Sequence, residues 1–174
     1  VVEDPAQPFV LIGYHKPNIN HEDNAVFDAI TDIMGSGRTS RLYRRLVRDK
    51  KIAMATSGFQ GMPGQKYPGL FLFYAMPARG HTNQECEEAI YVEIERLRNE
   101  PVTEQELEKA KTRAGAALIR QLDSNSGLAE QLTFYEVLTG DWRNLFKQLD
   151  QIDRVTAEDI QRVARTYFTT KNRT

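Results

Sequence analysis

The sequence predicts an α+β fold in which a mixed or antiparallel sheet is covered by helices. Three short apolar runs read as strands, at Phe9–Tyr14, Ala53–Phe59 and Leu70–Met76. Almost all of the second half has helical periodicity, and no linker-like stretch marks a domain boundary. The 174 residues, 40% hydrophobic and 27% charged, therefore suit one globular domain over residues 1–174.

The first part of the chain predicts a strand followed by two helices. After the strand at Phe9–Tyr14, turn residues indicate a loop over residues 15–23. The run Glu22–Met34 has apolar residues at helical spacing, and Gly35-Ser-Gly37 ends it. Thr39 or Ser40 can cap a second helix that runs to about Lys50.

The next two strands are expected to pair with each other. A Gly- and Pro-rich loop over residues 61–69 separates Ala53–Phe59 from Leu70–Met76, so antiparallel pairing is the simplest interpretation. The second of them is apolar at every position that points to either face. We therefore expect both faces of the sheet to be covered.

The remaining chain predicts five helices. Thr103 and Glu106 have the spacing of a capping box, and Thr156 and Asp159 repeat that spacing before the last helix. Gly140 closes the third helix. The expected spans are 82–99, 103–121, 125–139, 142–152 and 156–167.

The residues offer no self-sufficient catalytic or metal site. A hydrolytic zinc site needs two His one helical turn apart and an acid, and His15, His21 and His81 are not so spaced. We interpret all three as solvated loop histidines. Cys86 lies on the apolar face of a helix and reads as a buried, inert thiol. No Gly-x-Ser-x-Gly motif occurs.

The charge is uneven along the chain although its total is −1. Residues 38–51 hold seven basic residues and one acid, and residues 84–108 hold nine Glu and two Arg. Two interpretations stay open: both runs are solvated helix faces, or the basic helix meets an acidic partner or a substrate carboxylate. Nucleic acid is the weakest candidate partner because exposed aromatic residues are not interleaved with the basic ones. No apolar run is long enough for a membrane helix.

One long stretch carries a family resemblance. Residues 23–30 and 33–53, with Gly35-Ser-Gly37 followed by Ser40-Arg41-Leu42-Tyr43, resemble the pitrilysin/insulinase family of zinc peptidases. That family includes mitochondrial processing peptidase and the respiratory-chain core proteins. The segments 103–111 and 155–168 are similar to the C-terminal helices of the same family.

The resemblance implies a fold, a partner and a role. Family members pair two homologous α+β domains, of which the first carries His-x-x-Glu-His and zinc. This chain has no such motif, so it resembles the second, metal-free domain. The resemblance then implies no cofactor in this domain, zinc in a homologous partner domain in cis or trans, and a peptide substrate held between them. By this resemblance the parent is a zinc metalloendopeptidase, this domain alone is inactive, and a scaffold without proteolysis is the alternative.

Two positions correspond to the substrate-binding residues of the family's second domain, and one of them carries the family residue. Arg48 matches the family arginine, which implies an auxiliary catalytic and substrate-binding role. The family tyrosine seven residues later corresponds to Ala55, whose methyl group donates no hydrogen bond. The chain starts at Val1 and ends at Thr174, so we expect a longer parent in which another strand follows. Without that strand, one edge of the sheet is expected to be open. Periplasm and cytoplasm both stay open as compartments.

Overall fold

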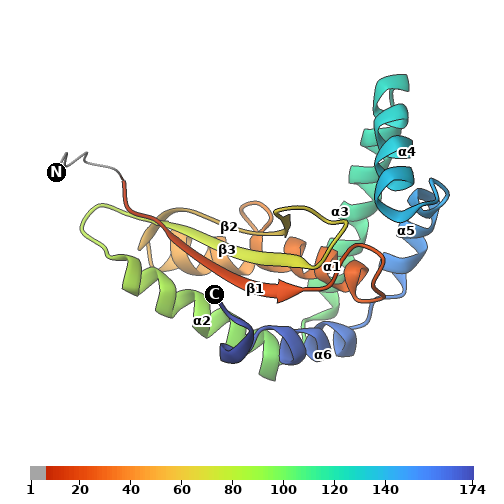
Figure 1. Cartoon of the computed structure of the whole chain (residues 1–174). Helices are drawn as coiled ribbons and strands as arrows, with labels where there is room; N and C mark the ends of the chain where they lie inside the picture. The colour runs from red at the N-terminus through yellow and green to blue at the C-terminus, as the bar shows by residue number, and fades with distance from the viewer. Residues whose placement is uncertain (1–6) are drawn as a thin grey trace.

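The computed structural model describes residues 7–174, and Figure 1 shows three strands packed against a series of helices. The expected elements are confirmed in order and type, with one exception in the second helix. Their bounds are β1 Val10–Lys16, α1 Asn24–Gly35, η1 Tyr43–Asp49, β2 Ala53–Met62, β3 Gly69–Pro77, α2 Asn83–Asn99, α3 Glu104–Leu122, α4 Asn125–Thr139, α5 Asn144–Asp153, α6 Ala157–Tyr167 and η2 Thr170–Asn172.

The strands form one antiparallel sheet in the order β1-β3-β2. The predicted pairing of β2 with β3 is confirmed, and β1 pairs with the other side of β3. Successive side chains of a strand point to opposite faces, so Phe71, Phe73 and Ala75 share one face of β3. All three are fully buried in the main core.

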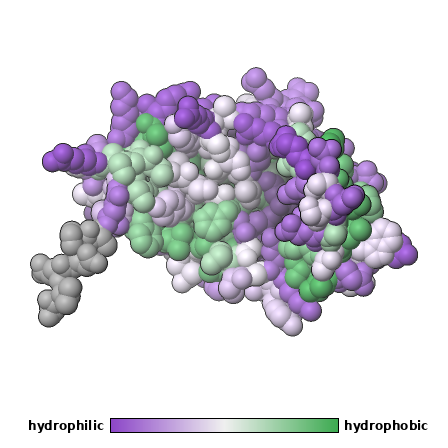
Figure 2. Space-filling view, turned by 90° about the horizontal axis from the view of Figure 1, so that it is seen from above, coloured by the Kyte–Doolittle hydropathy of each residue, from purple (hydrophilic) through white to green (hydrophobic). Residues whose placement is uncertain are grey.

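The expectation that both faces of the sheet are covered is wrong. Helices α1, α2 and α6 contact the strands, and Figure 1 places them on one side of the sheet. On the other side Leu11 is 48% exposed and Met54 is 52% exposed. Leu72 is nevertheless buried. A two-sided apolar strand therefore did not require a second helical layer. Figure 2, a view from above, shows apolar side chains gathered in two places, on the left half of the molecule and toward its right end.

The helix predicted from Thr39 or Ser40 to Lys50 differs in type. Residues 43–49 form a π-helix, in which the Lys50 N–H donates to the carbonyl of Arg45, five residues back. Such turns are rare and often occur at functional sites. The helix still places its basic residues on one side, as the periodicity indicates.

Complete capping boxes mark the starts of three helices. Thr82, Thr103 and Thr156 each form a complete capping box, so the two predicted boxes are confirmed. Gly140 ends α4 in the left-handed conformation, as predicted.

At the other edge of β1, Gly13 and Thr174 exchange backbone hydrogen bonds of 2.9 Å each. The last residue thus pairs with the edge of the sheet.

Two hydrophobic clusters hold the described residues together. The main one joins the sheet to α1, α2 and α6, and a small one contains Leu118, Tyr135 and Leu145 where α3, α4 and α5 meet. None of the described helices is both long and apolar enough to cross a membrane.

Candidate functional site: an arginine-rich pocket

The basic residues of η1 line a polar cavity of about 440 Å³. Its walls come from η1, the end of α2 and the start of α3, so segments that are distant in sequence meet here. The lining side chains are Arg41, Arg44, Arg45, Arg48, Asp49, Glu93, Arg96, Glu100, Pro101, Thr103, Gln105 and Glu106. We call this cavity the arginine pocket.

The floor of the arginine pocket is an ion pair between the buried Arg41 and the partly buried Glu106. Arg41 is 6% exposed and donates from Nε and Nη2 to the two carboxylate oxygens of Glu106, at 2.8 and 2.7 Å. The hydrogen bonds from Arg41 lower the pKa of Glu106 to about 2. Arg44 adds a third contact to Glu106 at 3.4 Å. This geometry has the bidentate form that only an arginine supplies.

A buried acid lies on the α2 side of the pocket. Glu93 is 1% exposed, with Arg96 3.2 Å away and Arg45 3.7 Å away. The basic and acidic runs of the sequence therefore meet within this chain. Neither open interpretation holds unchanged: the two runs are not simply solvated faces, and part of the acidic surface that faces the basic helix belongs to the same domain.

Arg48 is the residue at the open side of the pocket. Its side chain is 61% exposed, and Nε lies 2.7 Å from the carboxylate of its neighbour Asp49. Within the described residues no other acid pairs with it. Ala55 is exposed in β2 and does not line this pocket. The substrate-binding role of Arg48 stays a prediction.

Removing the ion pair between Arg41 and Glu106 should change the free energy of unfolding by an amount that depends on pH. We expect Glu106→Gln to lower the free energy of unfolding at pH 7 by about 2 kcal/mol, because Arg41 loses its charged partner in a buried place. The folded pKa of Glu106 lies below its unfolded value, so this contribution is full above about pH 5 and fades as the pH falls toward 2.

Urea unfolding of both proteins at pH 7 and pH 3 measures this effect, and the gap between them should shrink on acidification. Glu104→Gln is the matched control, since Glu104 is an exposed acid in the same helical turn. An equal difference in the free energy of unfolding at pH 7 and pH 3 would contradict a charged Arg41–Glu106 pair as its cause.

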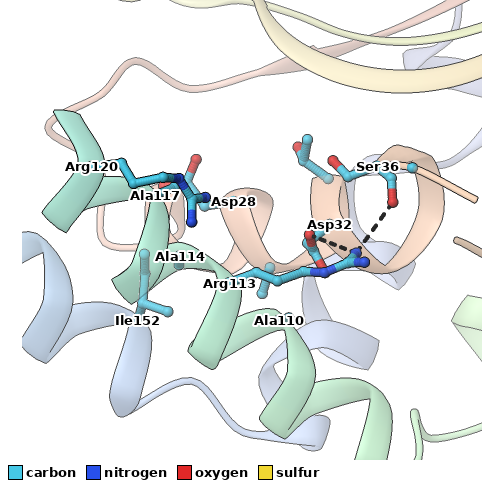
Figure 3. Close-up of a pocket in the computed structure, with 12 residues that line it drawn as sticks. Asp28, Asp32, Ser36, Ala110, Arg113, Ala114, Ala117, Arg120 and Ile152 are labelled. Atoms are coloured by element: carbon cyan, nitrogen blue, oxygen red, sulfur yellow. Dashed lines mark hydrogen bonds and ion pairs between the residues drawn. The ribbon is translucent and has the colours of Figure 1, made fainter. Parts of the chain in front are cut away.

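A second cavity, of about 430 Å³, lies between α1, α3 and α5. Figure 3 shows Arg113 extending from α3 to the end of α1. Its guanidinium lies 3.3 Å from a carboxylate oxygen of Asp32 and 3.3 Å from the carbonyl oxygen of Ser36, and it donates to Thr39 at 3.0 Å. Arg113 therefore ties α3 to the turn that precedes η1.

The lining of this second cavity includes a carboxyl that sequence patterning did not single out. Burial raises the pKa of Asp28 to about 6. Asp28 accepts a hydrogen bond from Gln60, while its other oxygen has no partner among the described residues. Asp28 lies between apolar positions of α1, and helical periodicity alone does not separate such a residue from a solvated one.

The single-residue expectations have mixed outcomes. Cys86 is fully buried, as predicted, and burial raises the pKa of its thiol. The prediction that all three histidines lie in loops is wrong for His15, because β1 extends to Lys16. His21 and His81 lie outside regular elements and contact Asp23 and Glu85.

Within residues 7–174, no three His, Cys, Asp or Glu side chains come together in a way that could hold a metal. Glu106 in the arginine pocket and Asp32 in the second cavity are instead paired with arginines.

Comparison with known proteins gives consistent matches. The zinc protease PqqE of Helicobacter pylori is 28% identical over 160 residues, which are 92% of this chain and 35% of that protein. The crystal structure of a protease from Helicobacter pylori superposes with a TM-score of 0.87 at 28% identity, over 95% of this chain and 39% of that one. The inactive peptidase domain of a Bordetella parapertussis protein gives a TM-score of 0.85 at 26% identity, over 100% and 91%.

This chain thus spans about a third of the Helicobacter zinc protease and nearly the whole of the separately solved Bordetella domain. The family model described as the peptidase M16 inactive domain matches residues 1–114. That match covers more than half of the sequence, and the described residues of the chain hold no metal-binding cluster. The chain belongs to the peptidase M16 inactive domain family.

Proposed function

We propose that this chain is the non-catalytic domain of a zinc-dependent peptidase and that it helps to enclose and bind peptide substrate beside a homologous zinc-bearing domain. The observation that carries the proposal is the arginine pocket, where Arg48 is exposed and the Arg41–Glu106 ion pair forms the floor. A guanidinium held there suits a peptide carbonyl or carboxylate. The zinc-bearing domain would supply the metal and the activated water.

The pocket would act by orientation rather than by chemistry of its own. Arg41 and Glu106 fix the position of η1 against α3, so the backbone that carries Arg48 is held in place. A substrate carboxylate or carbonyl oxygen would compete with Asp49 for the Arg48 guanidinium. The exchange is favourable when the partner domain excludes water from the pocket, since the interaction strengthens in a drier site.

A scaffold protein of the same fold is the second candidate. The observation that favours it is Ala55, which has no hydrogen-bond donor at the position where the family resemblance expects a tyrosine. A scaffold would keep the paired floor of the arginine pocket for stability and would have no need of Arg48.

Reconstitution tests the proposal. A zinc-bearing homologue from the same or a neighbouring gene is assayed on a quenched fluorescent peptide with and without this chain. We expect this chain to raise kcat/KM at least about tenfold and, by itself, to cleave nothing and bind no zinc at micromolar concentration. Complex formation with unchanged kcat/KM would support the scaffold instead.

A further inference from the structure

Asp28 of α1 and Gln60 of β2 share one hydrogen bond, and each leaves one buried oxygen without a partner. Gln60 Nε2 donates to Asp28 Oδ1. Among the described residues, neither Asp28 Oδ2 nor Gln60 Oε1 has a hydrogen-bond partner, and both atoms are buried. Most buried polar atoms in proteins are paired, so two unpaired oxygens in one pair of side chains need a physical explanation.

The protonation state of Asp28 decides whether these two oxygens can satisfy each other. A carboxylate oxygen and an amide carbonyl oxygen only accept hydrogen bonds, so they repel while Asp28 is charged. A proton on Oδ2 makes that atom a donor, and Gln60 Oε1 is then an acceptor in the same pair of side chains. The terminal torsions of Asp and Gln are soft, so the two planar groups can rotate to form two hydrogen bonds side by side. One proton therefore satisfies both oxygens.

The charged groups that β1, α1 and α3 bring near Asp28 have other partners or form no ion pair with it. Lys16, at the end of β1, is 4% exposed, and its ammonium donates to a side-chain amide of α1 at 3.3 Å. Arg113 of α3 pairs with Asp32, one turn along α1. Arg120 of α3 lines the same cavity as Asp28 (Figure 3), but among the described residues no ion pair joins the two.

The remaining helices around α1 bring no free charge to Asp28 either. The Tyr135 hydroxyl of α4 donates to Gln148 of α5. Burial, and then the charge of Asp28, raise the pKa of Tyr135, so this phenol stays neutral. On α6, Arg162 and Tyr167 bind the carboxylate that precedes α1 instead.

These surroundings favour the neutral form of Asp28 over a wider pH range than usual. Burial raises the pKa of Asp28 to about 6. The hydrogen bond from Gln60, the charge of Lys16 and the amide of Gln148 lower the pKa without cancelling that rise. Asp28 is half-buried as a residue and lines the second cavity, so a proton can reach its carboxyl from solvent.

We propose that Asp28 and Gln60 form a proton-binding lock between α1 and β2, which we call the Asp28–Gln60 lock. In the protonated lock, Asp28 Oδ2 donates to Gln60 Oε1 while Gln60 Nε2 donates to Asp28 Oδ1. Loss of the proton leaves one hydrogen bond and a buried negative charge, so α1 is held less firmly to β2. Helix α1 leads through residues 36–42 into η1, hence the proton also sets how firmly the basic helix of the arginine pocket is anchored. The lock does not depend on the proposed function.

Asp28→Asn tests the lock, because the Asn amide reproduces the protonated carboxyl. Its NH2 group donates to Gln60 Oε1 and its carbonyl accepts from Gln60 Nε2 at every pH. The folded pKa of Asp28 lies above the ordinary value of about 3.9, so the wild type loses stability as the pH rises from about 4 to about 6, and the loss is complete above that range. We expect Asp28→Asn to lower the equilibrium constant of unfolding on the order of 100-fold at pH 7.5 and by less than about tenfold at pH 4.5.

Urea unfolding of the whole chain at both pH values measures this difference. Asp150→Asn is the matched control, because it makes the same substitution at an exposed acid of α5. We expect the control to change the equilibrium constant of unfolding by less than about threefold at either pH. An Asp28→Asn variant that is no more stable than wild type at pH 7.5, or is stabilised equally at both pH values, would overturn the lock.

Nuclear magnetic resonance of the wild type keeps the lock testable if the variant fails to fold. The carboxyl carbon of Asp28 should titrate with a midpoint near pH 6, and the side-chain amide signals of Gln60 should move with the same midpoint. A midpoint near pH 4 would overturn the lock, since Asp28 would then hold its proton no better than an exposed acid. A midpoint near pH 6 with unmoved Gln60 signals would also overturn it, because the proton would then have another acceptor.

Discussion

Among the substitutions that add one methyl group at a described glycine of the core, Gly35→Ala is expected to destabilise the protein most. Helix α1 ends against β2 at this residue, and a Cβ there would lie 2.0 Å from the backbone nitrogen of Gly58 and 2.4 Å from its Cα. Both obstacles are backbone atoms of a paired strand, so no side chain can move aside.

We expect Gly35→Ala to lower the free energy of unfolding by about 3–5 kcal/mol, which corresponds to a melting temperature lower by about 10 °C. The helical preference of Ala over Gly recovers only about 1 kcal/mol of that loss. Thermal and urea unfolding followed by circular dichroism measure the effect. An insoluble variant would agree with the expectation, provided that its control folds.

Gly58→Ala is the matched control, because it adds the same methyl group on the other side of the same contact. The nearest atoms to that Cβ are 3.4–3.6 Å away, which is near ordinary van der Waals distance. We expect a change of less than about 1 kcal/mol. Equal losses from the two variants would show that the helix and strand shift freely, contrary to the close approach described above.

Arg48→Ala is expected to have the largest effect on function. If Arg48 orients the substrate in the intact protease, its removal should lower kcat/KM by about ten- to a thousandfold, the scale of one lost oxyanion donor. Folding should hardly change, since the side chain is 61% exposed and its hydrogen-bond partner is the adjacent Asp49. We expect the melting temperature to stay within about 3 °C of wild type.

Arg38→Ala controls for the loss of one positive charge from the same segment, because Arg38 is exposed and lies outside the arginine pocket. Steady-state kinetics on a peptide substrate and thermal melts of both variants are the measurements. Unchanged kcat/KM for Arg48→Ala would make it a solvated charge near the end of η1. A fall of the melting temperature by 10 °C or more would make it a structural residue instead.

Local signals in the sequence were enough for most of the secondary structure. The capping boxes at Thr103 and Thr156 are short-range hydrogen-bond patterns, and each marks the start of its helix. The apolar run at 70–76 similarly predicted β3 and its antiparallel pairing with β2. The turn at Gly35-Ser-Gly37 and the residues after it also carried the resemblance to the zinc peptidases, which the family match confirms.

The arginine pocket could be predicted only in part. The basic face of the second helix is visible in the sequence because its arginines recur at helical spacing. Its partners are not, since Glu106 lies 65 residues beyond Arg41 and Glu93 belongs to a different helix. Periodicity indicates which side chains share a face, but not which faces meet.

By itself, then, the sequence determined the order of elements, their caps, the α+β class and the absence of a zinc motif, because each depends on residues within a few turns of one another. Only the tertiary structure decided that helices cover one face of the sheet, that Arg41 and Glu93 are buried, and that Phe134 and Val137 of α4 are exposed. The physical reason is the same in all three cases. Burial and ion pairing depend on which distant segments pack together, and that is the outcome of all the packing and desolvation energies of the fold at once.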